Sequence, residues 1–326
     1  MSDSPSATPR RAPPFHVLAR PHGVEPAHLA AADLGARLSV LSAAARRVRR
    51  SQDSEAVHDL RVASRRLTAA IDLWRPLLEP KGARRARRRA RRLRRDLATL
   101  RDLEVSDALL AERMIGATPA VRAALEPLLR DGEQRLERER ADAAHVASRR
   151  RVRRVRDALE RALGRAPSPA APLDPRELAD DHVRATRERA TLALETAWMS
   201  GEDRALHAAR IRVKRWRYAI ECRAALIPAH ERAEPPAEPT PSPDDLQVVK
   251  RLRQLQDLLG RIQDLAVLRE RLESAARRAA LHARPAEAAA LQSVVVKLAP
   301  TRALAAAEAQ RLSTTLSAGA EGRAGV

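Results

Sequence analysis

Two short segments of this sequence place basic residues one helical turn apart behind a histidine. The first begins at His58 and continues through Arg61 and Arg65, and the second begins at His207. Both follow the pattern H-x-x-R-[VI]-x-x-[RK]-R-[LW]. At 100° per residue the basic side chains of each segment share one face of a helix, so each segment predicts a cationic stripe. Such a stripe suits a polyvalent oxyanion, because each planar guanidinium group bonds two oxygens at once.

An apolar stripe lies opposite each cationic one. In the second segment Trp216 and Ile220 fall on the side of the helix away from His207. In the first segment the corresponding residues are Leu60, Leu67, Ile71 and Trp74. A helical bundle could bury the apolar stripes and expose the cationic ones.

A second pair of matched segments follows the first pair. LRDLEV around Asp102 matches IQDLAV around Asp264. The two members of this second pair lie farther apart in the sequence than the two members of the first pair, because the proline-rich segment 228–245 lies between the motifs of the second half. Two matched motifs in the same order indicate an internal duplication.

The remaining sequence predicts long helices that would carry these segments. Aromatic residues make up 2% of the chain and glycine is scarce, whereas Ala, Leu, Arg and Glu dominate, which favours helices over sheets. Apolar periodicity predicts an all-α protein with helices over about 25–50, 54–78, 82–115, 119–162 (with a bend or break near Ser148), 175–199, 203–227, 244–281 and 285–315. The proline-rich segment 164–175 predicts a linker between two groups of four helices. Residues 1–26 are predicted as a disordered tail and 316–326 as a flexible C-terminus.

Charge is the strongest feature of the composition. The chain has 62 lysines and arginines against 42 aspartates and glutamates, a formal net charge of +20, and nine arginines fall within the twelve residues 84–95. This balance predicts a polyanionic partner, although an arginine-rich genome would also raise arginine throughout the chain. The single cysteine, Cys222, excludes a disulfide framework. The sequence has no 18-residue apolar run and no signal-peptide pattern, so we expect a cytoplasmic protein with no membrane partner.

The sequence contains no familiar catalytic pattern. It lacks HExxH, a phosphate-binding glycine loop and GxSxG. Glu55 and His58 fit the ExxH pattern of di-metal bundles, but Arg204 stands where the second half would need a carboxylate ahead of His207. We therefore expect no enzymatic activity, no metal and no cofactor.

The matched segments resemble the CHAD family of α-helical proteins. The resemblance rests on VHDLRVASRRL, LRDLEV, LHAARIRVKRWRYAIE and LQDLLGRIQDLAV, and it covers roughly residues 27–315. It implies two four-helix bundles related by a pseudo-two-fold internal repeat, the first over 27–163 and the second over 176–315. It also implies non-catalytic binding of inorganic polyphosphate, with residence on polyphosphate granules.

The resemblance and the basic pattern together define candidate polyphosphate-binding residues. They are His58, Arg61, Arg65, Arg66, Arg94, Arg101, His207, Arg210, Lys214, Arg217, Tyr218, Lys250 and Arg253. Asp102 and Asp264 are expected to fix helix contacts or to orient basic groups. The chain departs from the family pattern at Thr68, where a basic residue is common, and at Gln263, where asparagine is usual. The arginine run 84–95 is denser than the family pattern requires and would enlarge the binding surface.

Two other functions stay open at this point. Sequence-nonspecific binding to a nucleic-acid backbone suits the charge equally well, although aromatic residues for base stacking are nearly absent and no helix-turn-helix or zinc-finger spacing occurs. A scaffold that brings granule-associated proteins to polyphosphate granules is the other hypothesis. The tail 1–26 or the proline-rich segment 228–245 would then bind those partners.

Overall fold

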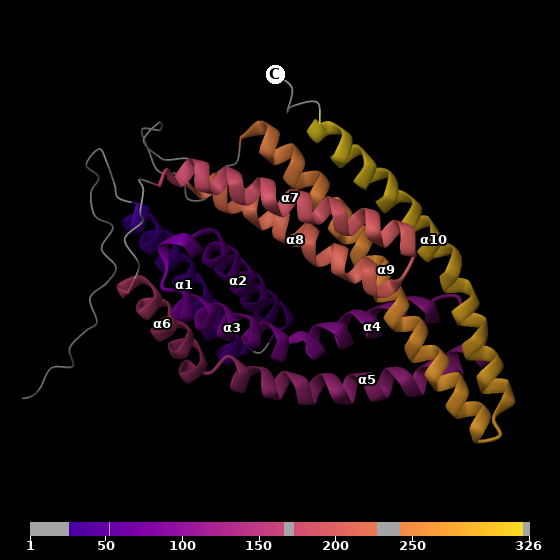
Figure 1. Cartoon of the computed structure of the whole chain (residues 1–326). Coiled ribbons are helices and arrows are strands. Elements are labelled where there is room, and N and C mark those ends of the chain that lie inside the picture. The colour runs from indigo at the N-terminus through magenta and orange to yellow at the C-terminus, as the bar shows by residue number, and fades with distance from the viewer. Residues whose placement is uncertain (1–25, 52, 166–172, 227–241, 322–326) are drawn as a thin grey trace, which may run out of the picture.

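Helices make up all the regular structure in the part of the chain that the computed structural model describes, residues 26–51, 53–165, 173–226 and 242–321 (Figure 1). Within these ranges no strand occurs, so the predicted all-α class is confirmed. The elements are α1 (Pro26–Ser51), α2 (Ser54–Leu73), the 3₁₀ turn η1 (Arg75–Leu77), α3 (Pro80–Asp96), α4 (Ala98–Met114), α5 (Pro119–Val146), α6 (Arg149–Gly164), α7 (Pro175–Ser200), α8 (Asp203–Leu226), α9 (Pro243–Leu281) and α10 (Pro285–Glu321). Nearly all of the predicted tail 1–26 and most of the proline-rich segment 228–245 lie outside the described residues.

Polar caps explain several helix boundaries. The side chain of Asp53 accepts a hydrogen bond from the N–H of Ala56 at the start of α2, and Ser242 accepts one from the N–H of Asp245 at the start of α9. Helix α7 ends at Gly201, whose φ of 65° lies in the left-handed region. These caps place the two histidine-bearing helices, α2 and α8, close to where the sequence predicts them.

The predicted helix over 82–115 is in fact two helices, α3 and α4. Leu97 separates them with φ −104° and ψ 9°, and its side chain is only 1% exposed. Its carbonyl accepts a hydrogen bond from Nη1 of Arg61 at 2.5 Å. Neither proline nor glycine marks the break, so no local sequence signal predicts it. Because of this break, α3 packs against α2 and α6, whereas α4 packs against α5 and α9.

Three other boundaries differ from the prediction or refine it. Helix α2 stops at Leu73 rather than near 78, because Pro76 lies in the 3₁₀ turn that follows. The bend or break expected near Ser148 is present as a break between α5 and α6. Helix α10 continues past 315 to Glu321, and Leu316, 6% exposed, packs in a core there.

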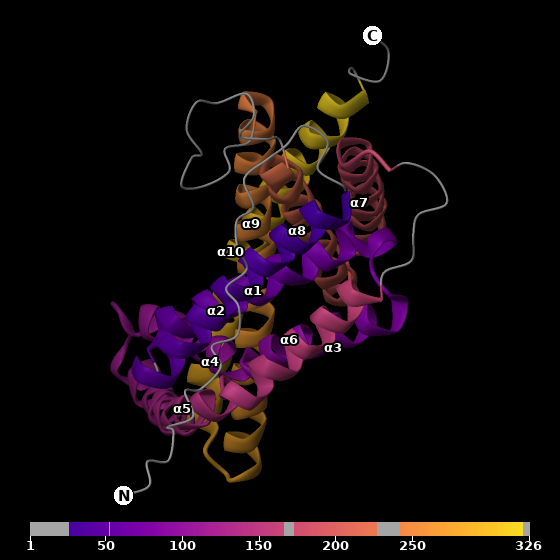
Figure 2. The same ribbon diagram turned by 90° about the vertical axis from the view of Figure 1, so that its left-hand side faces the viewer.

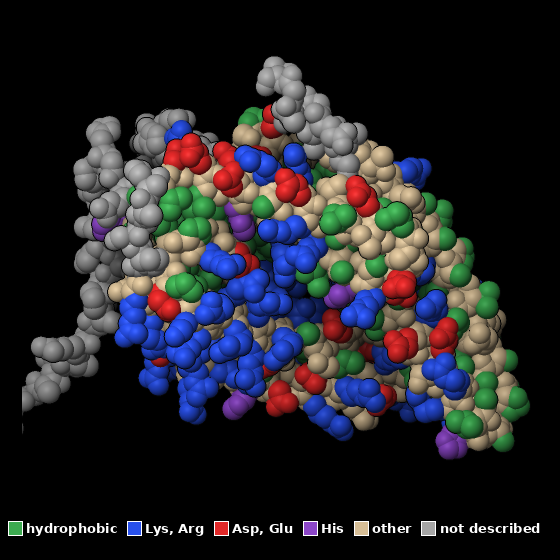
Figure 3. Space-filling view, viewed as in Figure 1, with side chains coloured by type: hydrophobic (Ala, Val, Ile, Leu, Met, Phe, Trp, Pro, Cys, Tyr) green, Lys and Arg blue, Asp and Glu red, His purple; other side chains and the backbone are tan. Residues whose placement is uncertain are grey.

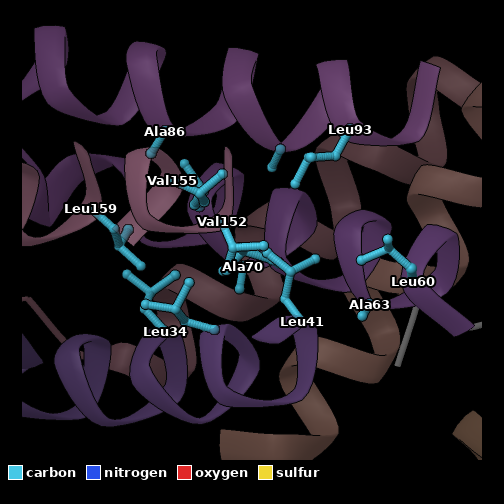
Figure 4. Packing of buried hydrophobic residues seen from close by; sticks show 14 of the residues in the cluster. Leu34, Leu41, Leu60, Ala63, Ala70, Ala86, Leu93, Val152, Val155 and Leu159 are labelled. Carbon is cyan, nitrogen blue, oxygen red and sulfur yellow. The ribbon is translucent and has the colours of Figure 1, made fainter. Parts of the chain in front are cut away.

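The first core joins α1, α2, α3 and α6 (Figure 4). Leu34 of α1 lies beside Leu159 of α6, and Leu41 of α1 and Leu60 of α2 belong to the same cluster. Helix α3 contributes only small residues and one leucine, namely Gly82, Ala83, Ala86, Ala90 and Leu93. A Cβ added at Gly82 would lie 2.9 Å from the backbone of Ala162, so α3 and α6 approach closely. Small core residues thus bring the arginine-rich helix tight against its neighbour.

Two further cores divide the remaining helices. One joins α7 and α8 to the first part of α9 and the last part of α10. The other joins α4 and α5 to the last part of α9 and the first part of α10, which extend beyond α7 and α8 in Figure 1. This third core contains residues from both sides of the linker 164–175. The predicted division into two four-helix bundles is therefore not confirmed, because the halves share a core.

A polar cluster beside the third core also ties the halves together. Arg271 of α9 donates from Nη1 to Ser106 Oγ and to Asp107 Oδ1 of α4, both at 2.7 Å. Its Nη2 donates to the carbonyl of Leu128 in α5, also at 2.7 Å. One guanidinium group thus holds three helices that come from different halves of the chain.

Candidate functional site

A large cleft, about 2390 Å³ in volume, lies among α2, α3, α4, α7, α8 and α9. Arginine is the commonest residue in its wall, and two arginines of α6, Arg151 and Arg154, complete the lining. Lys and Arg side chains gather around this hollow in Figure 3. The acidic residues that line the cleft are Asp72, Asp102, Asp181, Glu221, Asp257 and Asp264. The cleft is therefore strongly cationic.

The two predicted cationic stripes meet in this one cleft. Helices α2 and α8 contact each other, and the stripes that begin at His58 and His207 both line the space beside them. All the candidate residues predicted from the sequence line it except Lys250. Lys250 is exposed on α9, one turn before Arg253, and is not part of the lining. The structure therefore does not bring Lys250 together with the other candidates.

Lys214 lies in the cleft among guanidinium groups. It is half-buried on α8, and no carboxylate of the described ranges forms an ion pair with it. Burial, followed by the charges of Arg210, Arg65 and Arg217, lowers the pKa of Lys214 from 10.5 to about 6. In the ligand-free protein its ammonium form is thus disfavoured at neutral pH.

Arg61 and Arg94 are similarly crowded. Burial lowers the pKa of each guanidinium to about 10, and in both cases Arg65 is the next cause. Arg61 is 9% exposed and donates to the Leu97 carbonyl. It therefore supports the break between α3 and α4 in addition to facing the cleft.

Arg210 connects α8 to α9. Its guanidinium lies against Gly260, where an added Cβ would come within 2.8 Å of Nη2. Its Nε is buried and has no hydrogen-bond partner among the described residues. Burial lowers the pKa of Arg210, and the charge of Asp264 opposes this change. Burial also raises the pKa of Asp264, and the charge of Arg210 opposes this increase. The charge of Asp264 thus favours the charged form of Arg210.

Glu221 gathers three of the candidate residues from three helices. Its carboxylate lies 3.6 Å from Arg66 of α2, 3.5 Å from Arg217 of α8 and 3.8 Å from Arg253 of α9, and its side chain is 15% exposed. Arg217 also lies over the ring of Tyr218, 4.7 Å from its centroid. Tyr218 itself is only 5% exposed. At this end of the cleft the protein itself partly neutralises the arginines.

The histidines of the two motifs lie exposed at the cleft. Burial lowers the pKa of His58, and Arg101 and Arg65 lower it further. His58 is therefore less easily protonated in the free protein than an isolated histidine.

Several lining residues are not among the candidates predicted from the sequence. They include His182 and Arg189 of α7, Arg212 and Arg215 of α8, and Arg151 and Arg154 of α6. His182 and Arg189 are two helical turns apart, and that spacing could have marked them as one face. The described ranges hold no group of three or more His, Cys, Asp or Glu side chains placed to bind a metal ion. Cys222 is buried, and burial raises its pKa to about 12.

Comparison with known proteins defines the class of protein. Residues 32–273 match the CHAD domain, and the chain therefore belongs to the CHAD family. The fold is similar to PptA from Streptomyces chartreusis, with a TM-score of 0.64 and 21% identity over 89% of this chain and 99% of that one. It is also similar to the CHAD domain from the plant Ricinus communis, with a TM-score of 0.65 and 22% identity over 93% of this chain and 95% of that one. Because the sequence identities are this low, the two structures show only that the folds are similar.

No curated protein matches this chain closely enough to add to the comparison. In the described ranges, none of the helices combines the length and the apolar character needed to cross a membrane.

Proposed function

We propose that this protein binds inorganic polyphosphate in the cleft without catalysing its breakdown or synthesis. The observation that carries the proposal is the convergence of the α2 and α8 cationic stripes in one cavity of about 2390 Å³. Polyphosphate is a flexible polymer with about one negative charge per phosphate, so it can contact both stripes together. Arginine forks suit its oxygens because each can form two parallel hydrogen bonds.

The electrostatic state of the free cleft supports this proposal. Burial and neighbouring cations lower the pKa values of Lys214, Arg61 and Arg94. Such values mean that the positive charges destabilise one another when the cleft is empty of anions. A bound polyanion would offset both the repulsion between the cationic side chains and their loss of hydration. The affinity would then come from positive charges that the fold already holds together.

The aromatic content of the cleft favours polyphosphate over single-stranded nucleic acid. Tyr218 is the only aromatic residue other than histidine among the lining residues of the described ranges, and its ring is buried beneath Arg217. A base would therefore find no exposed tyrosine, tryptophan or phenylalanine ring there to stack on. Backbone-only binding of DNA is the competing outcome in the experiment below.

A triple variant tests the site. We expect Arg65→Gln, Arg210→Gln and Lys214→Gln together to weaken polyphosphate binding by at least roughly tenfold, by analogy with the removal of phosphate contacts from nucleic-acid complexes. Arg61 is left unchanged because its hydrogen bond to Leu97 supports the fold. Binding would be measured against graded chain lengths, with circular dichroism to check that helicity is retained.

The matched control removes three exposed arginines outside the cleft, Arg122, Arg138 and Arg277, none of which forms an ion pair among the described residues. Equal weakening in this control would show that net charge alone governs binding. Displacement of polyphosphate by DNA at equal phosphate concentration would instead favour the nucleic-acid alternative.

The cellular role and the internal repeat are parts of the same proposal. We infer that the two halves arose by duplication of a four-helix unit, because each supplies one cationic stripe to the cleft. We further propose a cytoplasmic protein that resides on polyphosphate granules beside granule-associated proteins. A fluorescent fusion of the protein should co-localise with the granules, and the same fusion of the triple variant should be spread through the cytoplasm. Unchanged localisation of that variant would contradict targeting by the cleft.

A further inference from the structure

The arginine run of α3 continues the positive charge of the cleft onto the outer surface. Ala86 and Ala90 lie on the buried side of α3, and arginines cover the other sides of this helix. Every arginine of α3 lines the cleft except Arg85, which lies outside the lining. We define the arginine ridge as Arg84, Arg85, Arg88 and Arg92 of α3 with Arg154 and Arg161 of α6. Its α3 members are exposed. Arg84, Arg88, Arg92 and Arg154 line the cleft at its edge, whereas Arg85 and Arg161 lie outside the lining.

Close helix packing holds the two parts of the ridge together. Helices α3 and α6 lie side by side (Figure 2), and Gly82 allows their backbones to approach. Nη1 of Arg89 donates to the carbonyl of Arg154 at 2.5 Å, which links the helices beneath the ridge. Figure 3 shows Lys and Arg side chains gathered on the surface beside the hollow, with a few acidic side chains among them.

Acidic residues compensate little of this charge. Arg84, Arg85 and Arg88 form no ion pair with any described residue. Arg92 lies 3.8 Å from Asp96, but that carboxylate is held more closely by Arg151, at 2.7 Å. Burial lowers the pKa of Arg89, and Arg161 and Arg154 lower it further.

The spacing of the ridge adds to this repulsion. Arg84, Arg88 and Arg92 are four residues apart, an arrangement in which like charges destabilise a helix. The ridge is therefore costly to the free protein, and a polyanion lying along it would remove the cost.

We propose that the arginine ridge, which is the α3 wall of the cleft continued outside the lining at Arg85 and Arg161, is a second binding segment that polyphosphate reaches only when the chain is long enough to extend beyond the α2 and α8 stripes. This inference rests on the proposed function. Helix α3 has 17 residues and is about 25 Å long. Tripolyphosphate is too short to occupy the cleft centre and the far ridge together, whereas a long chain can follow both. The ridge would thus make the protein bind long polyphosphate more tightly than short polyphosphate.

The test compares two anions and two variants. The ridge variant carries Arg84→Gln, Arg85→Gln, Arg88→Gln and Arg92→Gln, and glutamine keeps the helix propensity close to that of arginine. The control carries Arg122→Gln, Arg138→Gln, Arg261→Gln and Arg277→Gln, which removes the same charge at exposed sites outside the cleft lining. Affinity for tripolyphosphate and for long-chain polyphosphate is measured over a salt series, with thermal unfolding as a check on the fold.

We expect the ridge variant to bind long chains roughly tenfold or more weakly and to lose clearly less affinity for tripolyphosphate, by about threefold or less, because the α2 and α8 stripes are unchanged. The slope of log affinity against log salt for long chains should fall by about one for each phosphate that the ridge no longer binds. An equal loss of affinity in the control, or an equal loss for both anions, would overturn the inference. Failure of the unmodified protein to bind either anion would instead reject the proposed function. Tighter binding of DNA than of long polyphosphate to the ridge would reassign it to nucleic acid.

Discussion

Lys214 is the single residue whose charge depends most on what occupies the cleft. Its pKa is about 6 in the free protein because it lies half-buried among guanidinium groups of α2 and α8. A bound polyanion stabilises the ammonium form and raises this pKa. Binding therefore takes up a proton whenever the pH lies between the free and the bound pKa values.

The sign of the pH dependence follows directly. We expect polyphosphate affinity to fall as the pH rises from about 6 to 8, by up to about tenfold per pH unit for one proton, and to level off below 6. His58 acts in the same direction, so the measurement is made in a His58→Gln background. Isothermal titration calorimetry at several pH values checks this result.

Two substitutions at Lys214 separate charge from titration. Lys214→Arg should flatten the pH profile while binding stays tight, because arginine remains protonated. Lys214→Met should also make the affinity independent of pH, but the affinity should stay as weak as that of the unmodified protein at high pH. A profile that keeps its slope in both variants would assign the pH dependence to other groups.

Arg61 has a structural contact that its partner in the stripe, Arg65, lacks. The Leu97 carbonyl is buried between α3 and α4 and accepts from Arg61. Arg61→Gln should lower the free energy of unfolding by about 1–3 kcal/mol, the cost of leaving a buried carbonyl without its donor. Arg65→Gln removes the same charge without this bond and should leave stability unchanged or slightly higher. Chemical denaturation measures both, and equal destabilisation would contradict the assignment.

One glycine of α9 accommodates a cleft arginine of α8. Gly260 leaves room for the guanidinium of Arg210, and a Cβ would come within 2.8 Å of it. Gly260→Ala should therefore displace Arg210 and weaken polyphosphate binding severalfold. Helix stability should rise by roughly 0.5–1 kcal/mol, since alanine is the better helix residue.

A double-mutant cycle isolates this effect. If Gly260→Ala acts through Arg210, it should change affinity little when Arg210 is already glutamine. A full additional weakening in that background would show that the glycine acts in another way. Thermal unfolding of each variant confirms that the helices remain packed.

Helical periodicity is sufficient to predict most of the elements and the faces they bury. It places Leu60, Leu67, Ile71 and Trp74 opposite His58, and all four are buried. Periodicity does not predict the break at Leu97, because the break depends on a hydrogen bond from Arg61 and on burial in the first core. Lys250 lies outside the cleft lining for a related reason: periodicity gives the face of α9 but not how far along that helix the cleft extends.

At the scale of the whole molecule, the repeated motifs indicate two halves but not how the halves pack. Each stripe can be predicted from one helix, whereas the shared cleft depends on contact between α2 and α8, far apart in sequence. The third core likewise combines Leu110 and Leu125 of the first half with Leu268 and Leu291 of the second. No local pattern distinguishes these leucines from those that stay within one half.

The shared core predicts that the two halves do not fold as independent units. Separated halves, 1–168 and 169–326, would each expose one side of the third core and leave Arg271 without Ser106 and Asp107. We expect neither half alone to unfold cooperatively in scanning calorimetry, because each loses apolar burial that contributes about 25 cal/mol per Å². Mixing the halves should restore one transition near that of the intact chain, together with polyphosphate binding. Two separate cooperative transitions, one from each isolated half, would contradict this and would restore the description of two self-contained four-helix bundles.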